Sequence, residues 1–499
     1  MSEAVTVNTG SGTPRIAVNV DGQTRYATYS AGTGTSSLTF SYAPTIGDLD
    51  LDGVALTSPI DLNGGTITDL NGNPETNLTF TVPNTSGVKV DYPSLSMDFT
   101  NGTSGRYTLN GTAYNDLSSF LTAAGGTFTR ASVGTYFDST GTLQTAAPGQ
   151  PRFDHDPITH APKGILIEES RTNLLPYSED FSQWSKFTAT VTSNAATAPD
   201  GTMTADLISA NDTSLNNGFV YRNVTGNFTS YTVSVFAKAG NVSHFKIQPN
   251  AQIDGAITGF LATFDLSNQV ATTGNFYGGH FINTSASISS VGNGWYKCSS
   301  SFKITGTTFD APLKTWIYPY FAGDSVGSNV YIWGAQLEQG EFPTSYIPTA
   351  TMNVTRAADV QTFPTSGWFN PNSASFYAQF QENAALNISG SGSLIMGTAL
   401  DGRFIYRTSG SSAYRVYDGT NILTSPDQTL NSVVKVATKY GGSNMAISAN
   451  GSLVTSNFDG SWGNQGFAWL ANSRYNGWIA NWKYYPASMS NTQLQLLTQ

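Results

Sequence analysis

The chain has 499 residues, only 11% of them charged, and a formal net charge of −10. This acidic balance argues against a surface that binds nucleic acid through Lys and Arg. An aromatic content of 12% excludes a disordered chain. Abundant Gly, Ser, Thr and Asn disfavour helices, so we expect an all-β fold of about three domains, built as tandem β-sandwiches. A single cysteine, Cys298, excludes an intrachain disulfide and a multi-cysteine zinc site.

The sequence shows no targeting or membrane signal. The first residues have no basic stretch followed by an apolar core, and no run approaches the length of a membrane-spanning helix. We therefore expect synthesis in a cytoplasm and, for work outside the cell, release by a route other than secretion.

Residues 1–88 are predicted to form an Ig-like β-sandwich. Apolar and polar residues alternate at 36–42 and 78–82, with Gly and Asn turns between the strands. The motifs FSY at 40–42 and LNGGTITDLNGN at 62–73 resemble Ig-like repeats of large bacterial surface adhesins. That resemblance implies the same small antiparallel sandwich.

Residues 89–175 differ in pattern and are interpreted as a signature and connector segment. Leu117, Phe120 and Leu121 follow the i, i+3, i+4 spacing of a short amphipathic helix. Asp116 precedes this run and is predicted to cap the helix, which two glycines then end.

Three motifs in this segment carry a family resemblance: RASVGTYFD at 130–138, PRFDHDP at 151–157 and GILIEESRTNLL at 164–175. They resemble a signature shared by structural proteins of tailed bacteriophages, of the head spike and tail fibre type. The resemblance implies a virion protein that assembles in the bacterial cytoplasm and contacts other capsid or tail proteins. It also implies a homo-oligomer, most often a trimer, although no coiled-coil heptads support one here.

The remainder is predicted to hold two further sandwiches, joined by a linker at 351–363. Residues 176–350 have strands at 231–237, 294–302 and 330–338 and are interpreted as a jelly roll that resembles carbohydrate-binding modules.

Residues 364–499 alternate at 375–380, 402–407 and 432–438 and end in NGWIANWKYYP, at 476–486. They resemble the concanavalin A-like, laminin G-type lectin sandwiches of phage fibres. Ser490 is predicted to cap a last short helix.

Aromatic residues give the main functional hypothesis. Sugar rings have apolar faces that pack on Trp and Tyr, while their hydroxyls pair with Asn and Arg. Trp462 and Tyr475 lie in loops rich in Gly and Asn and are expected to be exposed, so we predict that they bind carbohydrate. Nearby polar residues complete this candidate site, namely Asn472, Arg474 and Asn476. Four tryptophans are interpreted as core or framework, namely Trp184, Trp295, Trp316 and Trp333. Even spacing places Trp478 and Trp482 on one strand face.

Two acidic motifs leave alternatives open. Asp48, Asp50 and Asp52 spell half of a calcium loop, but Pro59 stands where an EF-hand needs Glu. They form either a looser calcium site or an acidic turn, and we expect no other cofactor. The DHD motif at 154–156 is either a metal or acid–base site or a turn, and a turn is favoured.

These observations predict a bacteriophage fibre or spike protein of the head or tail that binds host surface polysaccharide. No spacing singles out a pair of catalytic carboxylates, so we expect no enzymatic activity. One alternative is a decoration protein that attaches to capsid or tail without binding glycan. The other is a polysaccharide depolymerase.

Overall fold

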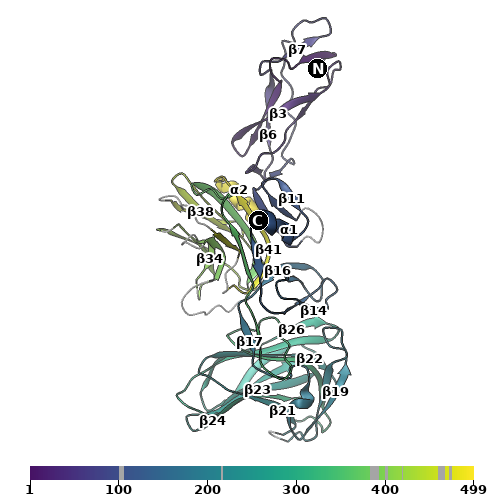
Figure 1. The fold of residues 1–499 in the computed structure, drawn as a ribbon, viewed down its shortest axis with the longest axis vertical. Coiled ribbons are helices and arrows are strands. Elements are labelled where there is room, and N and C mark those ends of the chain that lie inside the picture. Colours follow the sequence, from purple (N-terminus) through teal and green to yellow (C-terminus); the bar gives the residue numbers. More distant parts are fainter. Residues whose placement is uncertain are drawn as a thin grey trace.

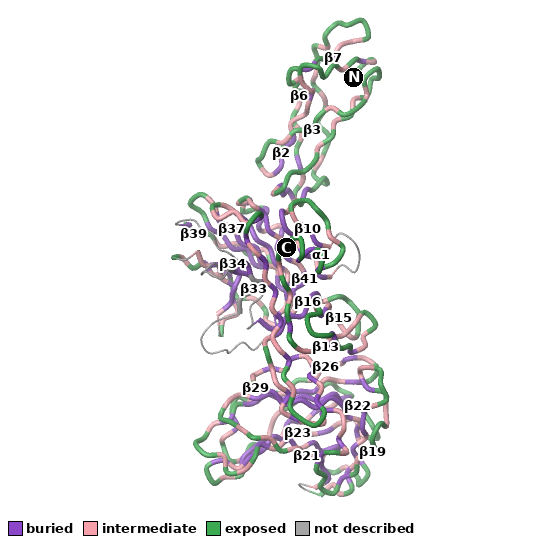
Figure 2. The backbone as a smooth tube through the Cα atoms, viewed as in Figure 1, coloured by how far each residue is buried: buried purple, intermediate pink, exposed green. Residues whose placement is uncertain are grey.

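The computed structural model describes residues 1–100, 106–214, 217–382, 393–398, 403–408, 410–418, 420–458, 467–470 and 475–499. The fold is nearly all β and consists of tandem β-sandwiches, as the sequence predicts. Three sandwiches lie in a row, and the one that holds the C-terminus lies between the other two (Figure 1). Buried residues gather inside the central and distal sandwiches (Figure 2). No helix among the described residues is long and apolar enough to cross a membrane.

The N-terminal sandwich combines a sheet of order β4-β3-β2-β6 with the strand pairs β1-β7 and β5-β8. The prediction of a strand at 78–82 is wrong, because this segment makes only isolated hydrogen bonds to β6. Ile60 N–H donates to the Leu78 carbonyl, and Phe80 N–H donates to the Ser58 hydroxyl. Pro59 has no N–H to continue a regular ladder. The strands are β1 (Val5–Asn8), β2 (Arg15–Val20), β3 (Gln23–Ala31), β4 (Thr39–Ser41), β5 (Leu49–Asp50), β6 (Ala55–Asp61), β7 (Thr66–Asp69) and β8 (Val90–Asp91).

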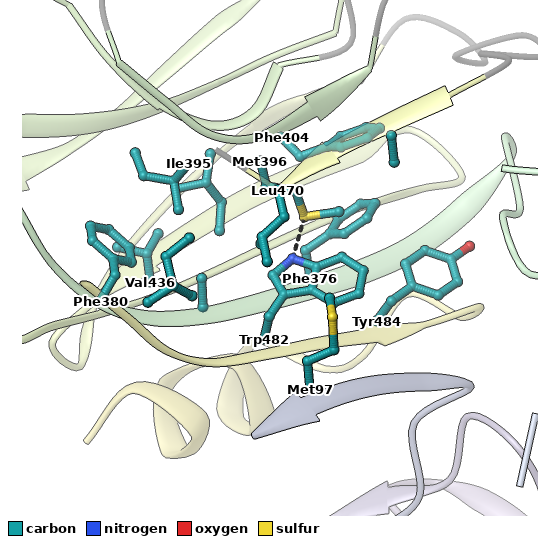
Figure 3. Packing of buried hydrophobic residues seen from close by; sticks show 14 of the residues in the cluster. Met97, Phe376, Phe380, Ile395, Met396, Phe404, Val436, Leu470, Trp482 and Tyr484 are labelled. Carbon is teal, nitrogen blue, oxygen red and sulfur yellow. Dashed lines mark hydrogen bonds between the residues drawn. The ribbon is translucent and has the colours of Figure 1, made fainter. Parts of the chain in front are cut away.

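The central sandwich is built from two parts of the chain that lie far apart in sequence. Its larger sheet has the order β11-β10-β9-β41-β32-β37-β38-β39, with β15 and β16 attached through β41; the second sheet has the order β12-β31-β40-β33-β34-β35-β36. Residues 89–175 therefore supply several of its strands. Met97 of β9 packs in the same core as Trp482, whose indole N–H donates to the Met396 sulfur over 2.8 Å (Figure 3).

The bounds of these central strands are β9 (Leu95–Asp98), β10 (Tyr107–Leu109), β11 (Thr112–Tyr114), β12 (Thr127–Thr129), β15 (Phe153–His155), β16 (Pro162–Ile167), β31 (Val360–Pro364), β32 (Ser373–Glu382), β33 (Ser393–Thr398), β34 (Arg403–Arg407), β35 (Ala413–Tyr417), β36 (Ile422–Asp427), β37 (Val434–Gly441), β38 (Asn444–Ala449), β39 (Ser452–Asn457), β40 (Phe467–Leu470) and β41 (Gly477–Tyr485).

The two helices confirm the predicted caps. Asp116 accepts the backbone N–H of Ser119 at the start of α1 (Leu117–Ala124), and Gly125 ends that helix with a φ of 66°. Ser490 accepts the Gln493 N–H at the start of α2 (Asn491–Thr498).

The distal sandwich, at the far end of the row, packs two six-stranded sheets around one core. Their orders are β18-β21-β28-β23-β24-β25 and β19-β20-β29-β22-β27-β26, and the strands predicted around 231, 294 and 330 are confirmed. The bounds are β18 (Ser185–Phe187), β19 (Ala189–Ala196), β20 (Ala205–Ala210), β21 (Phe219–Val224), β22 (Ser230–Ala239), β23 (His244–Ile253), β24 (Ala256–Asp265), β25 (Val270–Tyr277), β26 (Phe281–Gly292), β27 (Trp295–Ile304), β28 (Phe309–Tyr318) and β29 (Asn329–Gln339), with a 3-10 turn η1 (Phe181–Gln183) before β18.

Two small strand pairs lie where the central and distal sandwiches meet (Figure 1). They are β13 (Gly134–Phe137) with β14 (Leu143–Ala146), and β17 (Arg171–Asn173) with β30 (Val354–Arg356). The chain thus leaves the central sandwich through this junction, forms the distal sandwich and returns through the same junction.

Candidate functional site

One sheet of the distal sandwich carries a group of aromatic side chains on its outer face. On β28, Leu313 and Ile317 belong to the sandwich core. Because side chains alternate across a strand, Trp316 between them faces outward. We name the outward rings of β18, β21 and β28 the aromatic platform, and its members are Phe187, Phe219, Tyr221, Trp316 and Tyr318.

The rings of the aromatic platform pack against one another as a continuous layer. Phe219 stacks on Trp316 with ring centroids 4.6 Å apart and planes 17° apart, and Phe187 lies 5.4 Å from Phe219 on the other side. Tyr221 meets Trp316 edge to face at 6.5 Å. Phe187 is 48% exposed and both Tyr221 and Trp316 are half-buried, so these three rings present apolar surface to solvent, while Phe219 and Tyr318 are buried.

Polar side chains of the next strand, β23, continue this outer face. Lys246 pairs in register with Tyr318, and Gln248 pairs in register with Trp316. The Gln248 side-chain amide donates to the Tyr277 hydroxyl over 2.7 Å. The Lys246 ammonium lies 5.0 Å from the ring centroid of Tyr318. Burial lowers the pKa of Lys246, and Asp324 opposes that shift. A cation and an amide thus border the aromatic rings.

Two hydrogen-bond donors of the platform have no partner. The indole N–H of Trp316 and the hydroxyl of Tyr318 are shielded from solvent and meet no acceptor among the described residues. Burial raises the pKa of Tyr318, so its hydroxyl keeps its proton. A buried donor without an acceptor costs about 1–3 kcal/mol, and such groups are rare in folded proteins.

The arrangement suits a ligand with apolar C–H faces and many hydroxyls. Flat rings accept the apolar face of a sugar, and Lys246, Gln248 and Tyr277 offer polar partners at the edge. The sequence analysis interpreted Trp316 as a core or framework residue and missed this site. The signal was present in β28, where Lys314 and Trp316 share one strand face while Leu313 and Ile317 share the other.

The carbohydrate-binding residues predicted near the C-terminus do not form an exposed site in the described part of the chain. Trp462, Asn472 and Arg474 lie outside the described residues. Tyr475 is fully buried in the central core, so the expectation that it is exposed is wrong. Its hydroxyl donates to the Trp478 carbonyl over 3.1 Å, and burial raises its pKa. Asn476 is also fully buried, and its side-chain oxygen accepts the Glu169 N–H.

A β-bulge overturns the prediction that Trp478 and Trp482 share a face. Pairing between β32 and β41 shifts at Ala480, because Gln379 pairs with Asn481 and the next residue pairs with Ile479. One extra residue reverses the side-chain alternation. Trp482 is therefore fully buried in the central core, whereas Trp478 faces the junction with the distal sandwich and is half-buried.

The predicted calcium ligands serve the N-terminal sandwich instead. Asp48 is ion-paired with Arg25 over 2.7 Å and accepts the hydroxyl hydrogen of Tyr42. Burial would raise the pKa of Asp48, but these hydrogen bonds outweigh it and lower the pKa. Asp50 accepts the Gly53 N–H, while Asp52 accepts an amide hydrogen from the last helix.

In the ranges that the structure describes, no group of three His, Cys, Asp or Glu side chains could hold a metal ion. Of the two alternatives for Asp48, Asp50 and Asp52, their bonds within the protein favour the acidic turn.

The signature motifs meet in a buried ion network at the junction. Arg130 pairs with Asp359 over 3.0 Å, and Arg152 pairs with both Asp359 and Glu168. Arg356 also pairs with Glu168, over 3.1 Å. Burial would raise the pKa of Glu168, but Arg356, Arg152 and hydrogen bonds from Ser345 outweigh it and lower the pKa to about 2.

Each of the three signature motifs contributes one charge to this network, Arg130, Arg152 and Glu168. The connector TRAADV at 355–360 contributes the last two, Arg356 and Asp359. The motifs therefore supply the charged side chains that pair at the junction between the central and distal sandwiches.

Several glutamates of the junction and the distal sandwich already accept hydrogen bonds or ion pairs within the protein. Glu168 lies in the ion network, and Glu338 accepts hydrogen bonds from the backbone and the hydroxyl of Thr344. Glu169 and Glu341 line one groove of about 730 Å³ at the base of the distal sandwich. There Glu169 pairs with Arg171, and Glu341 accepts a hydrogen bond from a serine hydroxyl.

Comparison with known proteins leaves the family open. No protein-family model and no curated protein matches the chain. Among solved structures, domains LG4-5 of the mouse laminin α1 chain are 10% identical and align with 55% of this chain and 88% of theirs, with a TM-score of 0.18. Trypanosoma rangeli sialidase in complex with the inhibitor DANA is 9% identical and aligns with 99% of this chain and 94% of its own, with a TM-score of 0.22. Likenesses this weak carry no argument about activity.

The expectation that the chain is not an enzyme is corrected to an open question. Sialidases recur among the similar structures, also without the inhibitor, at 10% identity and a TM-score of 0.22. That expectation rested on motifs that the sequence lacks, among them a recognisable pair of carboxylates.

Proposed function

We propose that the chain is a bacteriophage fibre or spike protein that binds host surface glycans through the aromatic platform. The observation that carries glycan binding is the partly exposed ring of Trp316, which stacks on the buried ring of Phe219 and is bordered by Lys246 and Gln248. Stacked rings beside an amide and an ammonium suit saccharides better than a flat polar surface would.

The assignment to a virion rests on the resemblance of the signature motifs to phage structural proteins. The residues that carry this resemblance have a structural role, since each signature motif contributes one charge to the buried ion network at the junction. A rod of three sandwiches suits a protein that extends from a particle toward a cell (Figure 1). In a homo-oligomer such as a trimer, several weak platforms would add up to firm attachment.

The test compares Trp316→Ala with the wild-type chain on an array of bacterial capsular and O-antigen glycans. We expect wild-type binding to be reduced about 10-fold or more by Trp316→Ala, since the central ring of the platform is lost. Tyr26→Ala is the matched control, because Tyr26 is a 40% exposed aromatic residue of the N-terminal sandwich. Equal binding by both variants would contradict the platform as the glycan site.

Two further readouts address the remainder of the proposal. Release of reducing ends from each bound glycan shows whether binding is accompanied by cleavage, which would favour a depolymerase. A gold-labelled antibody raised against the purified chain, applied to phage particles whose genome encodes it, tests whether the chain is part of the virion. Unlabelled particles would contradict it.

A further inference from the structure

A second cavity lies between the central and distal sandwiches, away from the aromatic platform. It has a volume of about 310 Å³, at the lower end of the range for small-molecule sites. We name it the junction pocket. Its walls come from both sandwiches and from the signature motifs, and they include Phe137, Asp154, Lys163, Lys297, Tyr346 and Trp478.

The indole of Trp478 is held firmly in the wall of the junction pocket. Its N–H donates to one carboxylate oxygen of Asp154 over 2.6 Å, and the other oxygen accepts the Phe137 N–H over 2.6 Å. The DHD motif therefore does more than form a turn. Its first carboxylate fixes an aromatic ring at the edge of the cavity.

The carboxylates of the junction pocket are already occupied by the protein. Asp154 is 5% exposed and accepts the two hydrogen bonds just described. Asp156 accepts the backbone N–H groups of Ile158 and Thr159. Glu168 is neutralised by the arginines of the ion network. Among the described residues, every carboxylate that lines this cavity already has hydrogen-bond or ion-pair partners within the protein.

The cations are less well satisfied. The Lys163 ammonium lies 3.1 Å from the centroid of the Trp478 ring. Across the described ranges it has neither a hydrogen-bond acceptor nor an ion-pair partner. Burial lowers the pKa of Lys163, and Asp154 and Asp156 oppose that shift. Lys297 donates to the Thr344 carbonyl over 2.7 Å and has further N–H groups. The ammonium groups of Lys163 and Lys297 can therefore accept an anionic ligand as a further partner in this pocket.

We infer that the junction pocket binds a monosaccharide-sized ligand with a carboxylate group, of the hexuronate class. The carboxylate pairs with the Lys163 ammonium, and the sugar ring lies against the apolar wall formed by Phe137 and Tyr346. Two oxygens of a carboxylate satisfy an ammonium better than an aromatic face alone. This inference is independent of the glycan site on the aromatic platform, because the two sites share no residue.

Calorimetric titration with galacturonate, and with galactose as its uncharged counterpart, tests the inference. We expect galacturonate to bind, and Lys163→Met to weaken that binding about 10- to 100-fold while Lys163→Arg retains most of it. Lys89→Met is the matched control, because Lys89 is exposed in the N-terminal sandwich. Trp316→Ala should leave galacturonate binding unchanged, which separates this pocket from the platform. Equal affinity for galactose, or no effect of Lys163→Met, would overturn the inference.

A measurement on the wild-type chain avoids any question of folding. Galacturonate should slow reductive methylation of Lys163, as measured by peptide mass spectrometry, and leave Lys89 unaffected. Equal modification of Lys163 with and without galacturonate would overturn the inference.

Discussion

Replacing Glu168 with Gln tests whether the buried ion network holds the central and distal sandwiches together. Glu168 has a side chain that is only 2% exposed, and it is ion-paired with Arg152 over 2.7 Å and with Arg356 over 3.1 Å. Glutamine keeps the shape of the side chain and removes its charge. Arg356 then loses its ion-pair partner in a fully buried position, while Arg152 retains Asp359.

Two independent arguments give the magnitude. Removing one partner of a buried ion pair typically costs about 3–5 kcal/mol. The pKa of Glu168 falls from 4.5 to about 2 on folding, and a lowering of that size corresponds to about 3 kcal/mol. We therefore expect the free energy of unfolding to fall by about 3 kcal/mol at pH 7.

The sign of the pH dependence follows from the lowered pKa. The folded chain holds Glu168 ionised at a pH where the unfolded chain is already protonated. The stabilisation is therefore complete above pH 4.5 and is lost as the pH falls toward about 2. The difference between the wild-type chain and Glu168→Gln should shrink over this range.

Urea unfolding followed by tryptophan fluorescence measures both effects. At pH 7 the transition that includes the junction should shift by about 1 M or more. Glu75→Gln is a suitable control, because Glu75 lies in a loop of the N-terminal sandwich away from any buried ion pair. An unchanged midpoint at pH 7, or a difference that stays constant down to pH 2, would refute the reasoning.

Two other substitutions probe single backbone features. Asp116→Ala removes the side chain that accepts the Ser119 N–H, so we expect α1 to be destabilised by about 1 kcal/mol, measured by thermal unfolding; a change near zero would show that the cap is not needed. Gly164→Ala places a Cβ 2.1 Å from the Ile479 carbonyl oxygen at a φ of +112°. We expect a loss of about 2 kcal/mol or more, whereas a tolerated alanine would contradict the close approach of β16 to β41.

Local features were the ones that sequence reasoning predicted well. The caps Asp116 and Ser490, and the strands of the distal sandwich, follow from residue types within a few positions of each other. Such signals depend on hydrogen bonds to the nearest turn or on the two-residue period of a strand. A prediction failed where one extra residue changed the two-residue alternation of a strand. The bulge at Ala480 places Trp478 and Trp482 on opposite faces of β41.

The candidate sites could be predicted only in part. Tyr475 lies beside glycine and asparagine, which suggested exposure, yet it is fully buried in the central core. Trp316 was interpreted as core or framework, although its strand neighbours already indicate an outward face. The Lys163 and Trp478 contact joins positions more than three hundred residues apart, and no local pattern reports it.

The sequence by itself determined the all-β class, the helix caps and the presence of a conspicuous charged signature, because these depend on composition and on short-range spacing. Only the tertiary structure decided what the signature does. Separate motifs supply the charged residues of the network, namely Arg130, Arg152, Glu168 and Asp359. Burial removes water from these groups, so each carboxylate must pair with the arginines that surround it. The placement of the C-terminal strands between the other two sandwiches was decided in the same way, by long-range pairing of β41 with β9 and β16 (Figure 1).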